Sequence, residues 1–218
     1  MSNFIAFSGL DGAGKSTQID LLKKYFVTQG KPVLVFWSRG GYTPGFVLLK
    51  KLLRFIAGKK LPKAGNSKER DKAISNPKIQ RVWLNVALLD LIFYYSIYLR
   101  FQKVILRKTI ICDRYIYDTY IDFKLTFSNQ DFECFFLWKT LNKLALKPSK
   151  HYVALITVEE SLKRSIIKGE PFPDTEETLI NRLSFYKEYL KSSKSTYIDG
   201  FGDRLDIHNR VVNEVVKK

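Results

Sequence analysis

The stretch GLDGAGKST, from Gly9 to Thr17, sets the fold that we expect for the rest of the chain. It fits the pattern G-x-x-x-x-G-K-[ST] of a phosphate-binding P-loop. Glycines let the backbone curl until successive N–H groups point at phosphate oxygens, while Lys15 reaches the β- and γ-phosphates and the Ser16 hydroxyl takes a place on Mg²⁺. The pattern therefore predicts binding of ATP and Mg²⁺ by the residues of this loop, which are Gly9, Asp11, Gly12, Ala13, Gly14, Lys15, Ser16 and Thr17.

The sequence on either side of the loop supports this interpretation. Residues 3–8 form a short apolar run that predicts a buried strand, and Ile19, Leu22 and Phe26 recur at helical spacing after the loop. Strand, loop and helix is the setting that a P-loop requires, and it places phosphates at a helix N-terminus. The alternative is a glycine-rich turn that binds nothing.

Composition bounds the class of protein. A chain of 218 residues with 45% hydrophobic residues is long and apolar enough for one globular domain with a small lid. Its two cysteines, Cys112 and Cys134, have neither metal nor disulfide spacing, so we expect a reducing cytoplasm. No signal peptide is visible, and the most apolar run, 84–99, is expected to be too short to span a membrane.

The net charge of +16 needs an explanation. A basic excess can serve nucleic acid, an anionic membrane surface or small anionic substrates. The lysines are scattered, and the sequence lacks the stripe of cations interleaved with aromatics that single-strand binders use. This pattern favours a lysine-rich soluble surface and argues against a nucleic-acid partner.

Hydrophobic periodicity predicts strands that alternate with helices. Strands are expected at 3–8, 33–37, 109–112, 152–158 and 195–198, and helices at 15–28, 46–57, 77–106, 116–124, 131–146, 159–167, from 174 onward and at 205–216. Continuous apolar strands between helices are typical of an α/β fold, in which a parallel sheet has helices on both faces. A polar and basic insert without periodicity occupies about 58–76.

Three local features refine this outline. The run from Leu84 to Leu99 is apolar nearly all round, which predicts a buried helix. Asp174 with Glu177 predicts a capping box at the start of the next helix. Asp113 closes the third apolar strand, and an acidic residue there suggests a second carboxylate that helps to place Mg²⁺.

Together these motifs resemble the thymidylate kinase family. The first signature is FSGLDGAGKSTQ at 7–18, and the second is IICDRY at 110–115. The third is Leu162-Lys163-Arg164, followed later by Asn181-Arg182 and Tyr186, which is similar to the lid and the helix after it. The similarity extends over nearly the whole length, with the 58–76 insert as the main addition.

The resemblance implies a single P-loop kinase domain over 1–218, with a five-stranded parallel sheet and a lid at about 164–175. Catalysis would involve Lys15 on the transferring phosphate, Asp113 with Ser16 at Mg²⁺, and Arg164 or Lys168 from the lid. The implied acceptor-binding residues are Asp11, Arg39, Arg114, Tyr115 and Asp118.

Departures from the family concentrate in the acceptor half. Gly12 stands where some members carry an arginine, so the lid would have to supply that charge. The register of a helix arginine that contacts thymidylate holds Ile92 here, and Asp118 and Asp122 follow Asp-Arg-Tyr where the family has a serine and other residues. These changes predict weak dTMP activity relative to a dedicated enzyme.

Several alternatives remain open from the sequence. The leading function is phosphotransfer from ATP to a nucleoside monophosphate, dTMP first. The same chemistry on a phosphorylated sugar or polyol is the second, with Asp118 and Asp122 accepting hydroxyls, although the two could simply balance nearby lysines. A P-loop switch or a nucleic-acid-binding ATPase is a third. Arg164 and Arg182 could be solvated helix charges, and the long helix is also compatible with a homodimer face.

Overall fold

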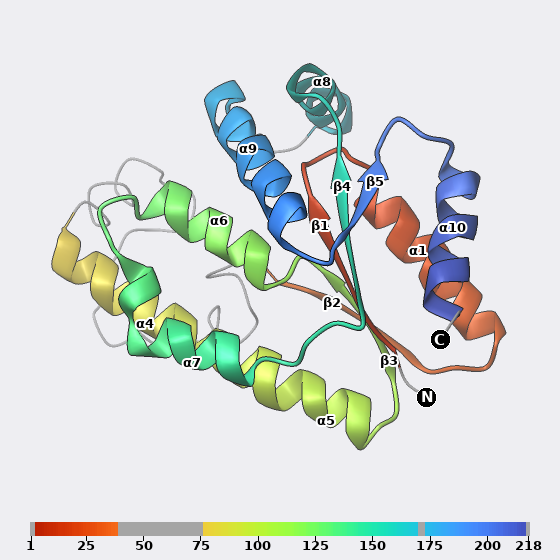
Figure 1. The fold of residues 1–218 in the computed structure, drawn as a ribbon, viewed down its shortest axis with the longest axis horizontal. Coiled ribbons are helices and arrows are strands. Elements are labelled where there is room, and N and C mark those ends of the chain that lie inside the picture. The colour runs from red at the N-terminus through yellow and green to blue at the C-terminus, as the bar shows by residue number, and fades with distance from the viewer. Residues whose placement is uncertain (1–2, 39–75, 170–172, 217–218) are drawn as a thin grey trace. The chain divides into compact units, whose positions relative to one another are not determined.

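The computed structural model describes residues 3–38, 76–169 and 173–216 (Figure 1). The loop that carries Arg39, the helix expected at 46–57 and all but the last residue of the basic insert lie outside the described residues. The chain divides into two compact units. The sheet unit comprises residues 1–38, 101–121 and 147–218, and the helical unit comprises 39–100 and 122–146. The single domain expected over 1–218 stays a prediction.

The sheet unit is built on five parallel strands. They are β1 (Phe4–Gly9), β2 (Val33–Trp37), β3 (Thr109–Asp113), β4 (Lys150–Leu155) and β5 (Thr196–Asp199), in the order β2-β3-β1-β4-β5. The central strand β1 is buried along its whole length, as its apolar sequence predicts. Because parallel strands end at the same edge, the carboxyl ends of β1 and β3 lie side by side. The predicted parallel α/β sheet is confirmed.

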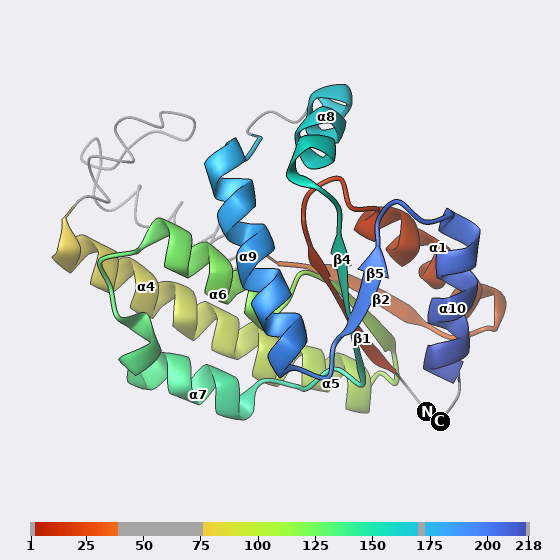
Figure 2. The ribbon, with the colours of Figure 1, turned by 45° about the horizontal axis from the view of Figure 1, so that its top comes forward.

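Helices cover both faces of this sheet. Helices α1 (Lys15–Thr28) and α10 (Arg204–Val216) lie together on one face, while α9 (Glu176–Ser192) lies on the other (Figures 1 and 2). Helix α1 buries Ile19, Leu22 and Phe26, the three residues whose spacing predicts it. Helices α6 (Ile116–Thr126) and α8 (Val158–Lys168) follow β3 and β4. This arrangement brings the residues that follow β1, β3 and β4 to one edge of the sheet.

Strand β2 is less buried than its apolar sequence predicts. Val35 and Trp37 are exposed, the latter by 47%, and only Phe36 is buried. The reason is its position, because β2 lies at the edge of the sheet and pairs only with β3. A continuous apolar run therefore does not guarantee a central strand.

The long helix expected at 77–106 is not a single α-helix. It comprises α4 (Pro77–Ile92), a π-helical segment η2 (Phe93–Tyr98) and α5 (Leu99–Val104). Within η2 the Tyr95 carbonyl accepts a hydrogen bond of 2.9 Å from the Leu146 backbone N–H, a partner outside the helix. Interruption of the α-helical ladder by an external partner is a recognised cause of such irregularity.

We expected this long helix to be buried on all sides, but one side is exposed. Leu84, Leu88 and Leu91 are fully buried, whereas Leu89, Phe93 and Ile97 are exposed by 56%, 50% and 60%. The two sets lie on opposite sides of the same apolar stretch. Composition alone does not reveal which side of an apolar helix its neighbours cover, so the prediction of complete burial is wrong.

The same helix is long and apolar enough to cross a membrane. It runs over 28 residues from Pro77 to Val104, with a mean hydropathy of 1.6 in its most apolar window, of which 39% is buried. The run 84–99, which we expected to be too short to span a membrane, lies within this longer helix. Length and composition alone are weak grounds for a membrane span, because the core helix of a soluble protein meets the same criteria.

Two further boundaries differ from the prediction. The helix expected at 131–146 breaks at Phe135, whose ψ of 136° is extended, and so separates the 3-10 turn η3 (Phe132–Cys134) from α7 (Phe136–Leu144). The cap of α9 is Thr175, whose side chain accepts from the Thr178 N–H at 3.2 Å. Asp174 is not the cap, because its carboxylate pairs with Arg182 at 2.7 Å.

Candidate functional site

The P-loop leaves no room for side chains at two of its glycines. Gly9 has a φ of +130°, and a Cβ there would lie 1.9 Å from the Ala154 carbonyl oxygen on β4. Gly12 has a φ of +75°, and a Cβ there would lie 2.9 Å from the Cβ of Arg164. Glycine at both positions is thus required by close packing as well as by backbone conformation.

Lys15 is buried at the first turn of α1. Its ammonium group donates to the carbonyl oxygens of Gly9 at 3.0 Å and Leu10 at 2.6 Å, and it lies 3.9 Å from Asp11 Oδ1. Burial, reinforced by the nearby Arg114 charge, lowers the pKa of Lys15 to about 8, while neighbouring carboxylates oppose that shift. The loop's own carbonyls therefore hold a desolvated cation beside the loop.

Asp113 ends β3 at the same edge of the sheet. Its Oδ1 atom is buried and makes no hydrogen bond within the part of the chain that the structure describes. Burial raises the pKa of Asp113, while the charges of Lys15 and Arg114 act in the opposite direction. A buried carboxylate oxygen without a donor is suited to a cation or to water held by one.

Asp113 and Ser16 fit a magnesium ion better than a metal whose ligands all come from protein side chains. Mg²⁺ is usually held through one or two carboxylates, with water and substrate phosphates filling its other positions. Asp113 supplies such a carboxylate, and the exposed Ser16 can supply a hydroxyl. Among residues 3–38, 76–169 and 173–216, no cluster of three or more His, Cys, Asp or Glu could enclose a metal.

Arg114 joins the P-loop to the start of α6. Its φ of +72° lies in the left-handed region, which is uncommon for a residue other than glycine, and its backbone N–H donates to the Phe7 carbonyl at 2.8 Å. Arg114 is 5% exposed, and its guanidinium pairs with both Asp11 and Asp118. The structure thus brings together five of the predicted site residues, namely Asp11, Lys15, Asp113, Arg114 and Asp118.

Asp118 lies in the first turn of α6 and is 0% exposed. Its Oδ2 accepts from the Ser8 hydroxyl and from the Tyr115 N–H at 2.9 Å, and its Oδ1 accepts from the Tyr186 hydroxyl at 2.7 Å and from Arg114 at 3.3 Å. Sequence reasoning assigned no role to Ser8, although it lies in the first signature at 7–18. Contact of Asp118 and the buried Tyr115 with an acceptor stays a prediction.

Arg164 lies against the P-loop from helix α8. Its Nη1 donates to the carbonyls of Gly12 at 2.9 Å and Gly200 at 3.2 Å, and its Nε donates to Glu160 at 2.7 Å. Its interpretation as a solvated helix charge is therefore wrong. The same holds for Arg182, which is buried and paired with Asp174. Lys168 is exposed in the last turn of α8, and residues 170–172 of the expected lid lie outside the described residues.

The remaining predicted residues lie elsewhere in the chain. Arg39 is outside the described residues. Ile92 and Asp122 belong to the helical unit, where Ile92 is the last residue of α4 and Asp122 is buried. Their proposed part in acceptor choice stays a prediction.

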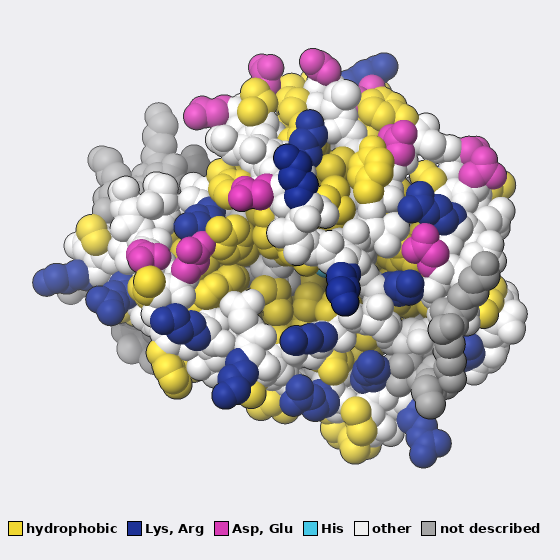
Figure 3. Space-filling model, viewed as in Figure 1, with side chains coloured by type: hydrophobic (Ala, Val, Ile, Leu, Met, Phe, Trp, Pro, Cys, Tyr) yellow, Lys and Arg dark blue, Asp and Glu magenta, His cyan; other side chains and the backbone are white. Residues whose placement is uncertain are grey.

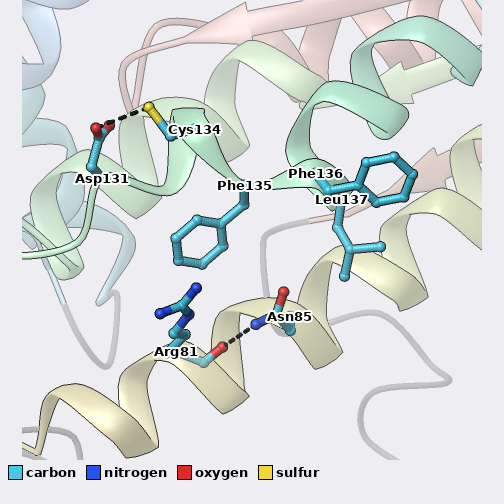
Figure 4. Close-up of a pocket in the computed structure, with 7 residues that line it drawn as sticks. All are labelled: Arg81, Asn85, Asp131, Cys134, Phe135, Phe136 and Leu137. Carbon is cyan, nitrogen blue, oxygen red and sulfur yellow. Dashed lines mark hydrogen bonds between the residues drawn. The ribbon is translucent and has the colours of Figure 1, made fainter.

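A cavity of about 390 Å³ lies in the helical unit, at the starts of α4 and α7 (Figure 4). The Arg81 guanidinium lies 5.4 Å from the centre of the Phe135 ring, and the Cys134 thiol donates to Asp131. The lining residues are Arg81, Asn85, Asp131, Cys134, Phe135, Phe136 and Leu137. None of these belongs to the predicted site.

Basic side chains are spaced over the face that Figure 3 shows, with hydrophobic and uncharged side chains between them. They do not merge into one continuous stripe on that face. This distribution accords with the scattered lysines of the sequence.

No protein-family model matches the chain. It is 24% identical over 213 residues to a probable thymidylate kinase of Methanocaldococcus jannaschii, a match that covers 96% of this chain and 93% of that protein. Shorter matches reach 46% identity over 57 residues with a thymidylate kinase of Thermosipho melanesiensis, and 48% over 50 residues with that of Thermosipho africanus. They cover 26% and 23% of this chain, and only 29% and 25% of those relatives. With the fold, these similarities support a kinase of the nucleoside monophosphate class.

Proposed function

We propose that the protein transfers the γ-phosphoryl group of ATP to a nucleoside monophosphate, with dTMP as the leading acceptor. The observation that carries the proposal is the convergence of Asp11, Lys15, Asp113 and Arg114 on one P-loop at the carboxyl ends of β1 and β3. Parallel α/β sheets bind their ligands at this edge. The named relatives and the parallel fold support the same class of reaction.

On the donor side, the chain would act by positioning and by neutralising charge, without a protein nucleophile. Lys15 would exchange its two carbonyl partners for phosphate oxygens, and the N–H groups at the start of α1 would point at the same phosphates. Arg164 of α8 already donates to the Gly12 carbonyl of this loop at 2.9 Å. Since Gly12 carries no charge itself, Arg164 would neutralise the transferring group.

A magnesium ion, when bound, would supply positive charge that neutralises the phosphates. Ser16 and Asp113 would hold it. Ionised Asp113 is favoured by such a cation, which would offset the effect of burial on its pKa.

On the acceptor side, Arg114 and Arg39 would bind the acceptor phosphate, and Asp11 would approach a sugar hydroxyl. Arg114 has five N–H donors, so pairing with two carboxylates is compatible with binding a phosphate as well. The sugar or polyol alternative relied on Asp118 and Asp122 as acceptors for hydroxyls, and the Asp118 carboxylate instead accepts four protein donors. A nucleotide acceptor is accordingly the better supported choice.

Acceptor-dependent release of ADP tests the proposal. The purified chain would be assayed with ATP, Mg²⁺ and each of dTMP, other nucleoside monophosphates and a phosphorylated sugar, with duplex and single-stranded DNA as further additions. We expect dTMP-dependent turnover. A kcat/KM above about 10⁵ M⁻¹s⁻¹, which is ordinary for an enzyme, would contradict the weak activity that Ile92, Asp118 and Asp122 predict. Turnover that depends on DNA but on no small acceptor would overturn the proposal itself.

A further inference from the structure

A chain of buried and partly buried hydrogen bonds runs through the sheet unit to the P-loop. His151 is on β4, and its ring has Nε2 at 2.8 Å from Ser8 Oγ and Nδ1 at 3.1 Å from both the Tyr189 and Ser195 hydroxyls. Ser8 in turn contacts Asp118, and Asp118 contacts Arg114. Arg114 then pairs with Asp11 inside the P-loop.

The directions of these hydrogen bonds follow from the donors available. Burial lowers the pKa of His151 to about 4, so its ring is neutral near pH 7 and carries one N–H. As a carboxylate, Asp118 can only accept, so the single Ser8 proton is donated to it. Ser8 must then accept from His151 Nε2–H, which leaves Nδ1 to accept from Tyr189 or Ser195. His151 thus donates to Ser8, and Ser8 donates to Asp118.

We propose that Asp118 is a positioning residue, which holds the Arg114 guanidinium beside Asp11 so that Arg114 can receive the acceptor phosphate. This inference rests on the proposed kinase function. Both oxygens of Asp118 are engaged by protein groups, so it acts through Arg114 and not by touching the acceptor. The left-handed backbone of Arg114 adds a reason for such support, because conformations of this kind persist only where the surroundings hold them.

A purely structural role is the rival explanation. Asp118 accepts from the Tyr115 N–H three residues earlier, as an acidic residue in the first helical turn does in a capping box, and this could stabilise α6 without affecting Arg114. Asp118→Asn separates the two roles. Its amide oxygen can still accept from Tyr115 and Ser8, while its NH₂ group would face Arg114 and Tyr186 as a donor.

The test is a double-mutant cycle of Asp118→Asn and Arg114→Ala. Asp118→Glu is added as the variant that keeps the charge. Tyr186→Phe is a control that removes one donor from Asp118. KM and kcat would be measured for dTMP and for ATP, with thermal unfolding of each variant. For Asp118→Asn we expect the KM for dTMP to rise about tenfold or more, with the KM for ATP within about threefold. In the Arg114→Ala background the same change should add less than about threefold.

Additive effects would overturn the inference, because a residue that acts through Arg114 has nothing to position once Arg114 is gone. An unchanged KM for dTMP in Asp118→Asn would also overturn it. If the wild-type chain turns over neither dTMP nor another nucleotide, the proposed function fails. The cycle is then judged on the equilibrium constants for unfolding of the single and double variants. Positioning predicts that the effects of the Asp118 and Arg114 substitutions on this constant deviate from additivity by about tenfold. Effects that are additive within about threefold would contradict the inference.

Discussion

The sequence predicts the structure of the P-loop more completely than that of the long helix from Pro77 to Val104. In the P-loop, nearly every residue has a role that its type and spacing anticipate, and the structure places Lys15 and two required glycines accordingly. In the long helix, the sequence correctly predicts a helix but not its π-helical interruption or its exposed side. Both regions have a distinctive local sequence, a motif in the P-loop and an apolar run in the helix.

The difference lies in where the determining contacts come from. A P-loop is defined by backbone conformation and by side chains within nine consecutive residues, so local chemistry is sufficient. The faces of an apolar helix are defined by which other elements cover them, and those elements are distant in sequence. The comparison can be tested by removing residues from each region and from the network beneath the P-loop.

The largest effect is expected at Lys15. Lys15→Met should reduce kcat by more than about 10³-fold, because no other residue of the loop can supply its charge to the transferring phosphate. Its unfolding free energy at pH 7 should not fall, since the lowered pKa of Lys15 means that burying its charge opposes folding. Turnover and chemical denaturation measure the two quantities. Near-normal turnover would remove the basis for treating this loop as the centre of the site.

Arg164 should have the next largest effect. Arg164→Ala is expected to lower kcat by about 10³-fold at most, as loss of a phosphoryl-clamping arginine can. Lys163→Ala is the matched control, since Lys163 is the exposed neighbour on the same helix and should leave kcat within about twofold. If Arg164→Ala and Lys168→Ala both keep kcat within a few-fold, the catalytic cation comes from another part of the chain.

Adjacent leucines test the two sides of the long helix. Leu88→Ala should lower the unfolding free energy by about 2–5 kcal/mol, because it opens a cavity at a fully buried position. Leu89→Ala, the matched change at a position 56% exposed, should cost less than about 1 kcal/mol. Urea denaturation of both variants gives the comparison. Equal losses would mean that Leu89 is covered in solution, as the sequence predicts for the whole helix.

The smallest effect is a loss of stability in acid that depends on His151. Its pKa is lowered from 6.5 to about 4, so the unfolded state binds a proton first as the pH falls. This contribution is fully present above about pH 6.5 and declines toward pH 4, by about 3 kcal/mol in total. Urea unfolding at pH 7 and pH 4.5 should therefore show a smaller decline for His151→Gln than for wild type. His208 remains in both proteins, so an equal decline would assign the acid sensitivity to other groups.

Much of the site could be predicted because its residues follow directly after strands. Asp113 ends β3 and Arg114 follows it, just as the P-loop follows β1, and adjacent parallel strands bring their carboxyl ends together. The positions of Ser8, His151 and Tyr186 could not be predicted in this way. They come from three elements far apart in sequence, and no spacing of residues announces that they share a hydrogen-bond network.

The sequence alone determined the P-loop, the alternation of strands and helices, and the identity of most residues at the site. Each of these depends on local backbone geometry or on periodic burial. Only the tertiary structure decided that Asp118 is enclosed by protein donors, that Arg164 lies on Gly12, and that one side of the long apolar helix is exposed. A side chain's type determines which partners it can accept. Which partners it meets depends on the packing of elements that the sequence separates by tens of residues.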